Sequence, residues 1–194
     1  MRKSKIKRQT RETDICIDLT IDGTGKSSIS TGIPFMDHML DLFTRHSLMD
    51  IAIKASGDIE VDDHHLVEDL GITLGGAIDK ALLERKGIWR FGEASVPLDE
   101  ALARCVIDFS GRPYIVFKGT IPRRKIKTFD PMLLKDFLNG FVASSRSTLH
   151  IEIPYAENAH HALEVVFKAL GRACQQAVTI HPRIKGVRST KGKL

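Results

Sequence analysis

The chain has 194 residues, which is enough for one large domain or two small ones. Hydrophobic residues make up 42% of it and charged residues 27%, a balance that excludes wholesale disorder. No apolar run approaches the roughly 20 residues of a membrane-spanning helix. Acidic residues follow the basic start where a secretory signal would be apolar. With three scattered cysteines and no C-x-x-C motif, the sequence predicts a soluble, cytoplasmic protein.

The formal net charge is +5, and the excess is uneven along the chain. Residues 181–194 include lysine and arginine but no acid, whereas a second basic cluster over 123–127 lacks interleaved aromatic residues. The tail could contact phosphate on nucleic acid, contact phosphate on a small substrate, or be a solvated end. We interpret the cluster over 123–127 as a solvated loop.

The first half of the chain alternates between β-type and helical patterns. In chain order, the spacing predicts a strand over 15–21, a short amphipathic helix over 36–43, a strand over 50–54 and a longer helix over 62–82. The last of these has acidic residues at its start and apolar residues at helical spacing, which is typical of a helix that packs on a core.

The second half repeats this order. Its predicted elements are strands over 105–109 and 114–117, a helix over 132–138, a strand over 149–153 and a helix over 158–177. The motif H-H-x-x-E begins at His64 and again at His160, 96 positions later. These repeats predict an α+β fold with an internal duplication, in which each half is a mixed or antiparallel sheet packed against two helices.

We expect the half-repeats to cover residues 1–92 and 93–194, with the basic tail in the second half and the join near 89–95. Neither half is large enough to bury a substantial core alone, which favours one intimate duplicated unit over two tethered domains.

The repeated histidine pairs suggest metal ligands. Residues i and i+4 share a helix face, so His64 can act with Glu68, and His160 with Glu164. The adjacent His65 and His161 point roughly 100° away, toward other ions. Imidazole with carboxylate suits Mn, Fe or Zn, and the absence of thiolate argues against a structural Cys–Zn site.

Pseudo-symmetry between the halves would build two similar sites. The proposed sets are His38, His65, His160 and Glu164 for one ion, and His64, Glu68, Asp136 and His161 for the other. Asp136 enters because it follows Pro131 much as His38 follows Pro34. Four protein ligands leave positions open for substrate on an octahedral ion, as catalysis requires. The alternative is a structural metal site or no metal.

These segments resemble a known enzyme family. D-H-M-L at 37–40, D-D-H-H-x-x-E-D at 62–69 and N-A-H-H-x-x-E at 158–164 are similar to signatures of imidazoleglycerol-phosphate dehydratase, in its monofunctional form without a phosphatase domain. W-R-F-G, G-R-P-Y and S-T-K-G extend the likeness along nearly the whole chain. The resemblance implies dehydration of D-erythro-imidazoleglycerol phosphate to imidazole acetol phosphate in histidine biosynthesis. The implied route is through a di-metal-bound imidazolate and a diazafulvene-like intermediate.

The resemblance also implies the same ligands for the first ion, and His64, Glu68 and His161 with a fourth ligand for the second. It further implies two Mn²⁺ per active site, and sites between subunits of a homo-oligomeric shell of 24 chains. Other divalent metals suit these ligands too. It adds substrate contacts at Glu12, His46, Arg90, Arg112, Lys168, Ser189, Thr190 and Lys191. Arg112, Lys168 and Lys191 suit a phosphate monoester. Glu12, Glu68 and Glu164 are the candidate catalytic carboxylates, with Glu12 transferring a proton.

One position departs from the family pattern. Where the family usually has E-H-F, this chain has Lys135-Asp136-Phe137. The aspartate either replaces imidazole with a hard oxygen donor, which Mn tolerates, or is too short and leaves water in its place. His150, at the edge of a predicted strand, is a weaker substitute.

Three other functions compete with this interpretation. A different di-metal enzyme could act on a small phosphorylated substrate. A basic nucleic-acid-binding protein would use the basic ends but leave both H-H-x-x-E motifs unexplained. A metal-storing shell would not need the separated arginines and lysines. We therefore expect a small phosphorylated imidazole as substrate, and neither nucleic acid nor membrane as partner.

Overall fold

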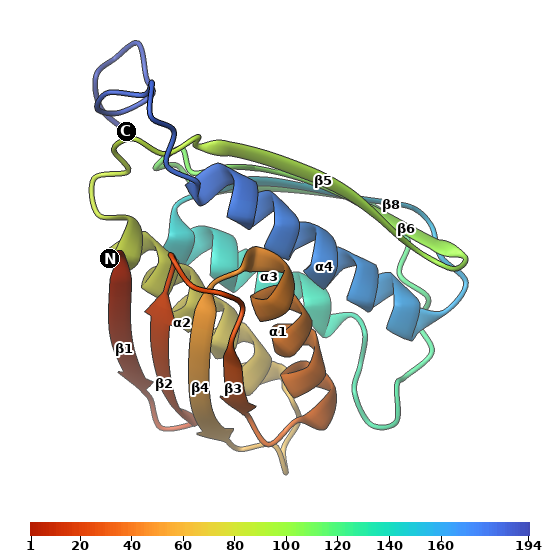
Figure 1. Ribbon diagram of the computed structural model, residues 1–194. Coiled ribbons are helices and arrows are strands. Elements are labelled where there is room, and N and C mark those ends of the chain that lie inside the picture. The colour runs from red at the N-terminus through yellow and green to blue at the C-terminus, as the bar shows by residue number, and fades with distance from the viewer.

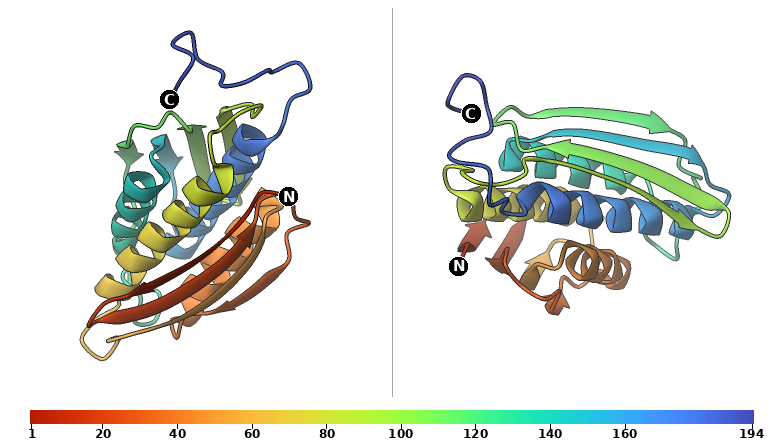
Figure 2. Two further views of the ribbon diagram at one scale, coloured as in Figure 1. Left: turned by 90° about the vertical axis from the view of Figure 1, so that its left-hand side faces the viewer. Right: turned by 45° about the horizontal axis from the view of Figure 1, so that its top comes forward.

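Two four-stranded sheets enclose a layer of four helices in the computed structural model, which describes residues 1–194 (Figure 1). The first sheet contains β1 (Lys3–Gln9), β2 (Thr13–Thr20), β3 (Ser27–Ser30) and β4 (Asp50–Gly57). The second contains β5 (Phe91–Leu98), β6 (Ala101–Asp108), β7 (Tyr114–Gly119) and β8 (Thr148–Tyr155). The helices are α1 (Pro34–Ser47), α2 (His64–Leu82), α3 (Leu133–Ser145) and α4 (Ala159–Val178). The two rotated views in Figure 2 show the helices between the two sheets.

The two sheets have the same topology. Their strand orders are β1-β2-β4-β3 and β5-β6-β8-β7. In each sheet the first three strands of that order are antiparallel, whereas the edge strand β3 or β7 pairs in parallel with β4 or β8. The predicted α+β fold with internal duplication is confirmed. The division at residues 92 and 93 stays a prediction; β5 begins at Phe91.

Alternation along the central strands explains which face each sheet buries. In β2, Ile15, Ile17 and Leu19 are fully buried, while Asp14 and Asp18 point to the other face. Side chains on a strand alternate between faces, so this order places one apolar row against the helices.

Each helix has its closest helical partner in the other half of the chain. α1 packs on α4, and α2 packs on α3. Glycine permits both approaches: a Cβ on Gly75 of α2 would lie 2.3 Å from the Phe141 carbonyl oxygen of α3. A Cβ on Gly171 of α4 would lie 2.8 Å from the Phe43 carbonyl oxygen of α1. The helix pairs therefore join the halves, and each pair places side chains from both halves near each other.

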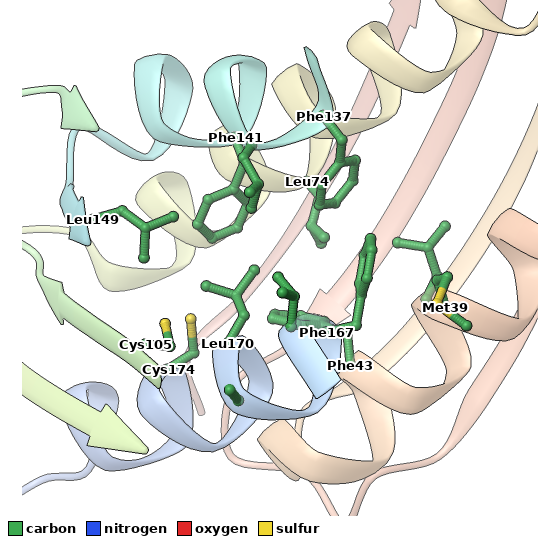
Figure 3. Close-up of a cluster of buried hydrophobic side chains, with 14 of the residues drawn as sticks. Met39, Phe43, Leu74, Cys105, Phe137, Phe141, Leu149, Phe167, Leu170 and Cys174 are labelled. Atoms are coloured by element: carbon green, nitrogen blue, oxygen red, sulfur yellow. The ribbon is translucent and has the colours of Figure 1, made fainter. Parts of the chain in front are cut away.

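One continuous core fills the space between the sheets. Its 48 buried residues come from both halves, so neither half has a core of its own. Phe43, Phe141 and Leu170 meet near its centre, and Cys105 and Cys174 lie beside them (Figure 3). The predicted apolar stripe of α2, which includes Leu74 and Ile78, is fully buried in this core. None of the four helices is both long and apolar enough to span a bilayer.

Candidate active site

The first turn of α4 presents two of the predicted ligands. Asn158 caps this helix, because its side chain accepts a hydrogen bond from the His160 backbone N–H at 2.8 Å. His160 Nε2 then lies 3.1 Å from Glu164 Oε2, one turn further along. His38 Nε2, from α1, lies 3.8 Å from the same oxygen. One ligand atom from each of these three residues lies within 4.8 Å of the other two.

The chemistry of this group fits a divalent ion. Two imidazole nitrogens and one carboxylate oxygen converge without a thiolate, which is the donor mix that Mn²⁺ and Zn²⁺ accept. Partial burial opposes ionisation of Glu164, but the hydrogen bond and charge of Lys168, followed by the charges of His38 and His160, lower its pKa. Glu164 is therefore an anionic ligand near neutral pH.

The α2–α3 pair places His64 between two carboxylates. His64 Nε2 lies 3.7 Å from Glu68 Oε2, and His64 Nδ1 lies 3.7 Å from Asp136 Oδ2 of α3. Asp136 is the structural counterpart of His38. Each lies ten residues before the residue that caps the C-terminal end of its helix, Arg146 for α3 and Leu48 for α1, and both caps have a left-handed backbone conformation. The predicted equivalence of these two positions thus has a geometric basis.

The second histidine of each pair turns away from both groups. His65 Nδ1 lies 3.0 Å from Asp58 Oδ2, and His161 Nδ1 lies 2.9 Å from Glu100 Oε2. The hydrogen bond to Asp58 raises the pKa of His65, and the hydrogen bond to His161 lowers the pKa of Glu100. Within one chain, the structure therefore brings His38, His160 and Glu164 together and leaves His65 and His161 outside this group. His64 contacts Glu68 and Asp136 through different ring nitrogens. Ligand atoms of Asp99, Glu100 and His161 also lie within 4.8 Å of one another.

Glu12 lies beside His65, and His46 lies near Glu164. Glu12 Oε2 is 3.8 Å from His65 Nδ1, and 54% of its side chain is exposed, so the carboxylate remains accessible to a ligand. His46 is in the last turn of α1, where burial, followed by the charges of Lys168 and Arg172, lowers its pKa. Lys168 donates to Glu164, with 2.7 Å between Nζ and Oε1.

The other predicted substrate residues gather at one hollow of about 680 Å³. Arg90, Arg112, Ser189, Thr190 and Lys191 all contribute to its lining. Arg90 binds the Asp108 carboxylate through Nε at 2.6 Å and Nη2 at 2.9 Å, and its Nη1 donates to the Arg188 carbonyl oxygen at 2.8 Å. Arg90 thus attaches the tail to the second sheet, whereas Arg112 and Lys191 supply free positive charge.

This tail hollow and the α4 metal ligands lie at opposite ends of one helix. The Arg90 backbone N–H donates to the Ala177 carbonyl near the C-terminal end of α4, and His160 is in its first turn. Seventeen residues of helix correspond to roughly 25 Å. In Figure 1 the tail likewise extends beyond the end of α4 that lies nearest the N-terminus of the chain.

A loop that the sequence indicated only as solvated lies beside both ligand groups. Arg124 and Lys125 line a hollow with His160, and Lys125 also lines one with His64. Their side chains are exposed, as predicted, but their location could not be inferred from charge alone. The available signal was position in the chain, since this loop leads directly into α3. His150, by contrast, is exposed on β8 between the buried Leu149 and Ile151, so it faces away from the helices.

Comparison with known proteins gives consistent matches. The family model described as imidazoleglycerol-phosphate dehydratase matches residues 31–174. The enzymes of that name from Halalkalibacterium halodurans and Bacillus subtilis are each 52% identical to this chain over 194 residues, which cover all of both chains.

Solved structures agree with these matches. The imidazoleglycerol-phosphate dehydratase from Staphylococcus aureus has a TM-score of 0.83 and 38% identity, and the match covers 91% of this chain and 98% of that one. The Pyrococcus furiosus enzyme, solved in complex with (S)-C348, has a TM-score of 0.84 and 38% identity, with 97% and 100% covered.

Proposed function

Because the chain belongs to the imidazoleglycerol-phosphate dehydratase family of metal-dependent hydro-lyases of histidine biosynthesis, we propose that it converts D-erythro-imidazoleglycerol phosphate to imidazole acetol phosphate. The observation that supports this most directly is the convergence of His38, His160 and Glu164 from two helices. The resemblance seen in the sequence motifs is confirmed by the family match.

The proposed active site holds two Mn²⁺ ions, although other divalent metals suit the same donors. His38, His160 and Glu164 would hold one ion, completed by His65 of a neighbouring subunit. His64, Glu68 and Asp136 would hold the other, completed by the neighbour's equivalent of His161. Support comes from the convergence of His38, His160 and Glu164 and from the contacts of His64 with Glu68 and Asp136. The remaining histidines, His65 and His161, contact carboxylates outside these clusters.

Divalent ions held by these ligands would act as Lewis acids and would stabilise the imidazolate form of the substrate ring. The ring would then expel the adjacent hydroxyl, which would leave as water after taking a proton from Glu12 and would give a diazafulvene-like intermediate. Loss of the neighbouring C–H proton then gives an enol, which tautomerises to the ketone. Glu12 is suited to move protons near the diol, because its carboxylate is accessible and adjacent to His65. Glu68 and Glu164 serve as anionic ligands.

The substrate phosphate would bind cationic side chains and hydroxyls. Arg112, Ser189, Thr190 and Lys191 line the tail hollow and offer the charge-assisted donors that phosphate prefers. Lys168 and His46 lie near Glu164 instead, where they can contact the substrate on the metal side. Arg90 would act by holding the tail in place.

Distance within the chain favours an active site shared between subunits. The tail hollow lies roughly 25 Å along α4 from the metal ligands, which is far longer than a small phosphorylated imidazole. A neighbouring chain must then supply one part of the site. We therefore include a homo-oligomer in the proposal. Its size, a shell of 24 chains, rests on the family resemblance, and its cytoplasmic location rests on the sequence composition.

The proposal is tested with metal-stripped protein reloaded with Mn²⁺ and given imidazoleglycerol phosphate. We expect imidazole acetol phosphate to form with the phosphate ester intact, which ³¹P NMR follows directly. Release of inorganic phosphate without the ketone would instead support a di-metal hydrolase. Equal turnover before and after reloading would contradict the role of the metal.

A further inference from the structure

Glu12 and Glu100 occupy equivalent positions in the two halves. Glu12 ends the β1–β2 hairpin and directly precedes β2, which begins at Thr13. Glu100 ends the β5–β6 hairpin and directly precedes β6, which begins at Ala101. Each carboxylate approaches Nδ1 of the second histidine of its half, His65 for Glu12 and His161 for Glu100.

The two glutamates differ in how they are engaged. Glu100 Oε2 lies 2.9 Å from His161 Nδ1, and its Oε1 accepts the Asn158 backbone N–H at 3.0 Å. Both of its oxygens are therefore in use. Glu12 remains 3.8 Å from His65 Nδ1.

Asp58 accounts for the difference. It is the first residue after β4, and it lies 3.0 Å from His65 Nδ1, so this imidazole already has a carboxylate partner. The first residue after β8 is Ala156, which offers no such group. In the second half, the hairpin glutamate is therefore the carboxylate that reaches the histidine.

We propose that Glu100 and Asp58 are positioning residues that hold the Nδ1–H of His161 and His65, so that each Nε2 is presented to a metal ion. A neutral imidazole has one protonated nitrogen, and a carboxylate on that nitrogen fixes both the tautomer and the ring orientation. The inference rests on the proposed function. It explains why only one of two equivalent glutamates is free for proton transfer.

Glu100→Gln separates positioning from a purely structural role. Gln retains an oxygen that can accept from Asn158, but its amide NH₂ then faces His161 Nδ1 and favours the tautomer protonated at Nε2. We expect the metal-free variant to unfold at the wild-type temperature. We also expect one of its two Mn²⁺ ions per chain to bind 10- to 100-fold more weakly, a typical effect of losing such a partner.

Binding is measured by titrating Mn²⁺ alone into full-length, metal-stripped protein and following free Mn²⁺ by EPR. Asp99→Asn is the matched control, since Asp99 is the adjacent hairpin carboxylate and asparagine tolerates its left-handed backbone (φ 46°). It should bind Mn²⁺ as the wild type does. If Glu100→Gln fails to fold, Asp58→Ala tests the same role at His65.

The outcomes are distinguishable. Wild-type affinity in Glu100→Gln overturns the inference and leaves the proposed function intact. Equal weakening by Asp99→Asn also overturns it, because Asp99, Glu100 and His161 would then act as direct ligands. Failure of the wild type to bind Mn²⁺ would overturn the proposed function itself, and this inference with it.

Discussion

The Asp136 carboxylate faces the His64 imidazole across the α2–α3 interface, with 3.7 Å between Oδ2 and Nδ1. The short side chain thus approaches a predicted ligand, although the family motif usually has histidine there. Its counterpart His38 lies at a similar distance, 3.8 Å, from Glu164 on the other helix pair. The two halves therefore place unlike donors at equivalent positions.

This geometry predicts that Asp136 is a metal ligand. Asp136→Ala should remove or weaken one Mn²⁺ per chain by about 10-fold or more, whereas Asp136→His should restore binding with the family donor. Metal analysis of equilibrated protein measures the stoichiometry. Lys135→Ala, at the neighbouring exposed position, is the control and should bind both ions. Unchanged occupancy in Asp136→Ala would remove Asp136 from the ligand set.

Sequence patterns were sufficient for most helices and for the central strands. Ile15, Ile17 and Leu19 alternate, and Leu74 and Ile78 recur at helical spacing, because each row faces the core. The edge strands β1, β3 and β5 were missed, since most of their residues are exposed or half-buried and their alternation carries little apolar signal. Local periodicity also could not show that α1 packs on α4 and α2 on α3.

The candidate ligands were predictable because i and i+4 spacing places His64 with Glu68 and His160 with Glu164 without knowledge of the fold. Contacts between distant segments were not. Glu100 and His161 are 61 positions apart, and only the return of β8 and α4 past the β5–β6 hairpin brings them together. Asp58 was also missed, because nothing in its local pattern marks it as a histidine partner.

Glu12→Gln should abolish proton transfer but preserve the metal site. Glu12 is 3.8 Å from His65, and His65 already binds Asp58, so the ligand geometry does not depend on Glu12. We expect kcat to fall by about 10²- to 10⁴-fold, with Mn²⁺ stoichiometry unchanged. Steady-state kinetics and metal analysis measure the two effects. Asp14→Asn, which changes a half-buried carboxylate on the outer face of β2, should retain full turnover. A fully active Glu12→Gln enzyme would exclude the role.

Gly75→Ala should destabilise the fold by forcing α2 and α3 apart. The added Cβ would lie 2.3 Å from the Phe141 carbonyl oxygen, and backbone must move to relieve this contact. Overpacking of this kind costs about 1–3 kcal/mol of unfolding free energy.

Gly76→Ala is the matched control, because its Cβ would make ordinary contacts only, with the tip of Ile6 at 3.5 Å and Cβ of Ser144 at 4.0 Å. Alanine is the better helix former, so the control should be neutral or stabilised by up to about 1 kcal/mol. Denaturant titrations followed by circular dichroism compare both; equal stability would contradict the close approach.

Stability should depend on pH through Asp22. The hydrogen bond from Arg2, with 2.5 Å between Nη2 and Oδ1, lowers the pKa of this carboxyl. Because the carboxyl pKa is lower in the folded chain, the ion pair stabilises the fold at pH values above the pKa of the unfolded chain, about 3.9. This stabilisation is lost as the pH falls through the pKa of the folded chain. Asp22 is 44% exposed, so the effect is below about 1 kcal/mol. Denaturation of wild type and Asp22→Asn should differ at pH 7 and converge below about pH 4. A difference that stays constant across this range would contradict the ion pair.

An active site shared between subunits predicts complementation between two inactive variants. His65→Ala removes a ligand on the α2 side, and His160→Ala removes one on the α4 side. Each variant alone should lose at least about 10²-fold in kcat, because one ion loses a ligand. Mixed assemblies contain sites in which His160 of one chain meets His65 of the other, so co-expression should restore a substantial fraction of activity.

The control pairs His160→Ala with Glu164→Ala, which both damage the α4 side and should remain inactive together. Turnover per chain in purified mixed assemblies measures the recovery, and its absence in assemblies of normal size would show that each chain completes its own site.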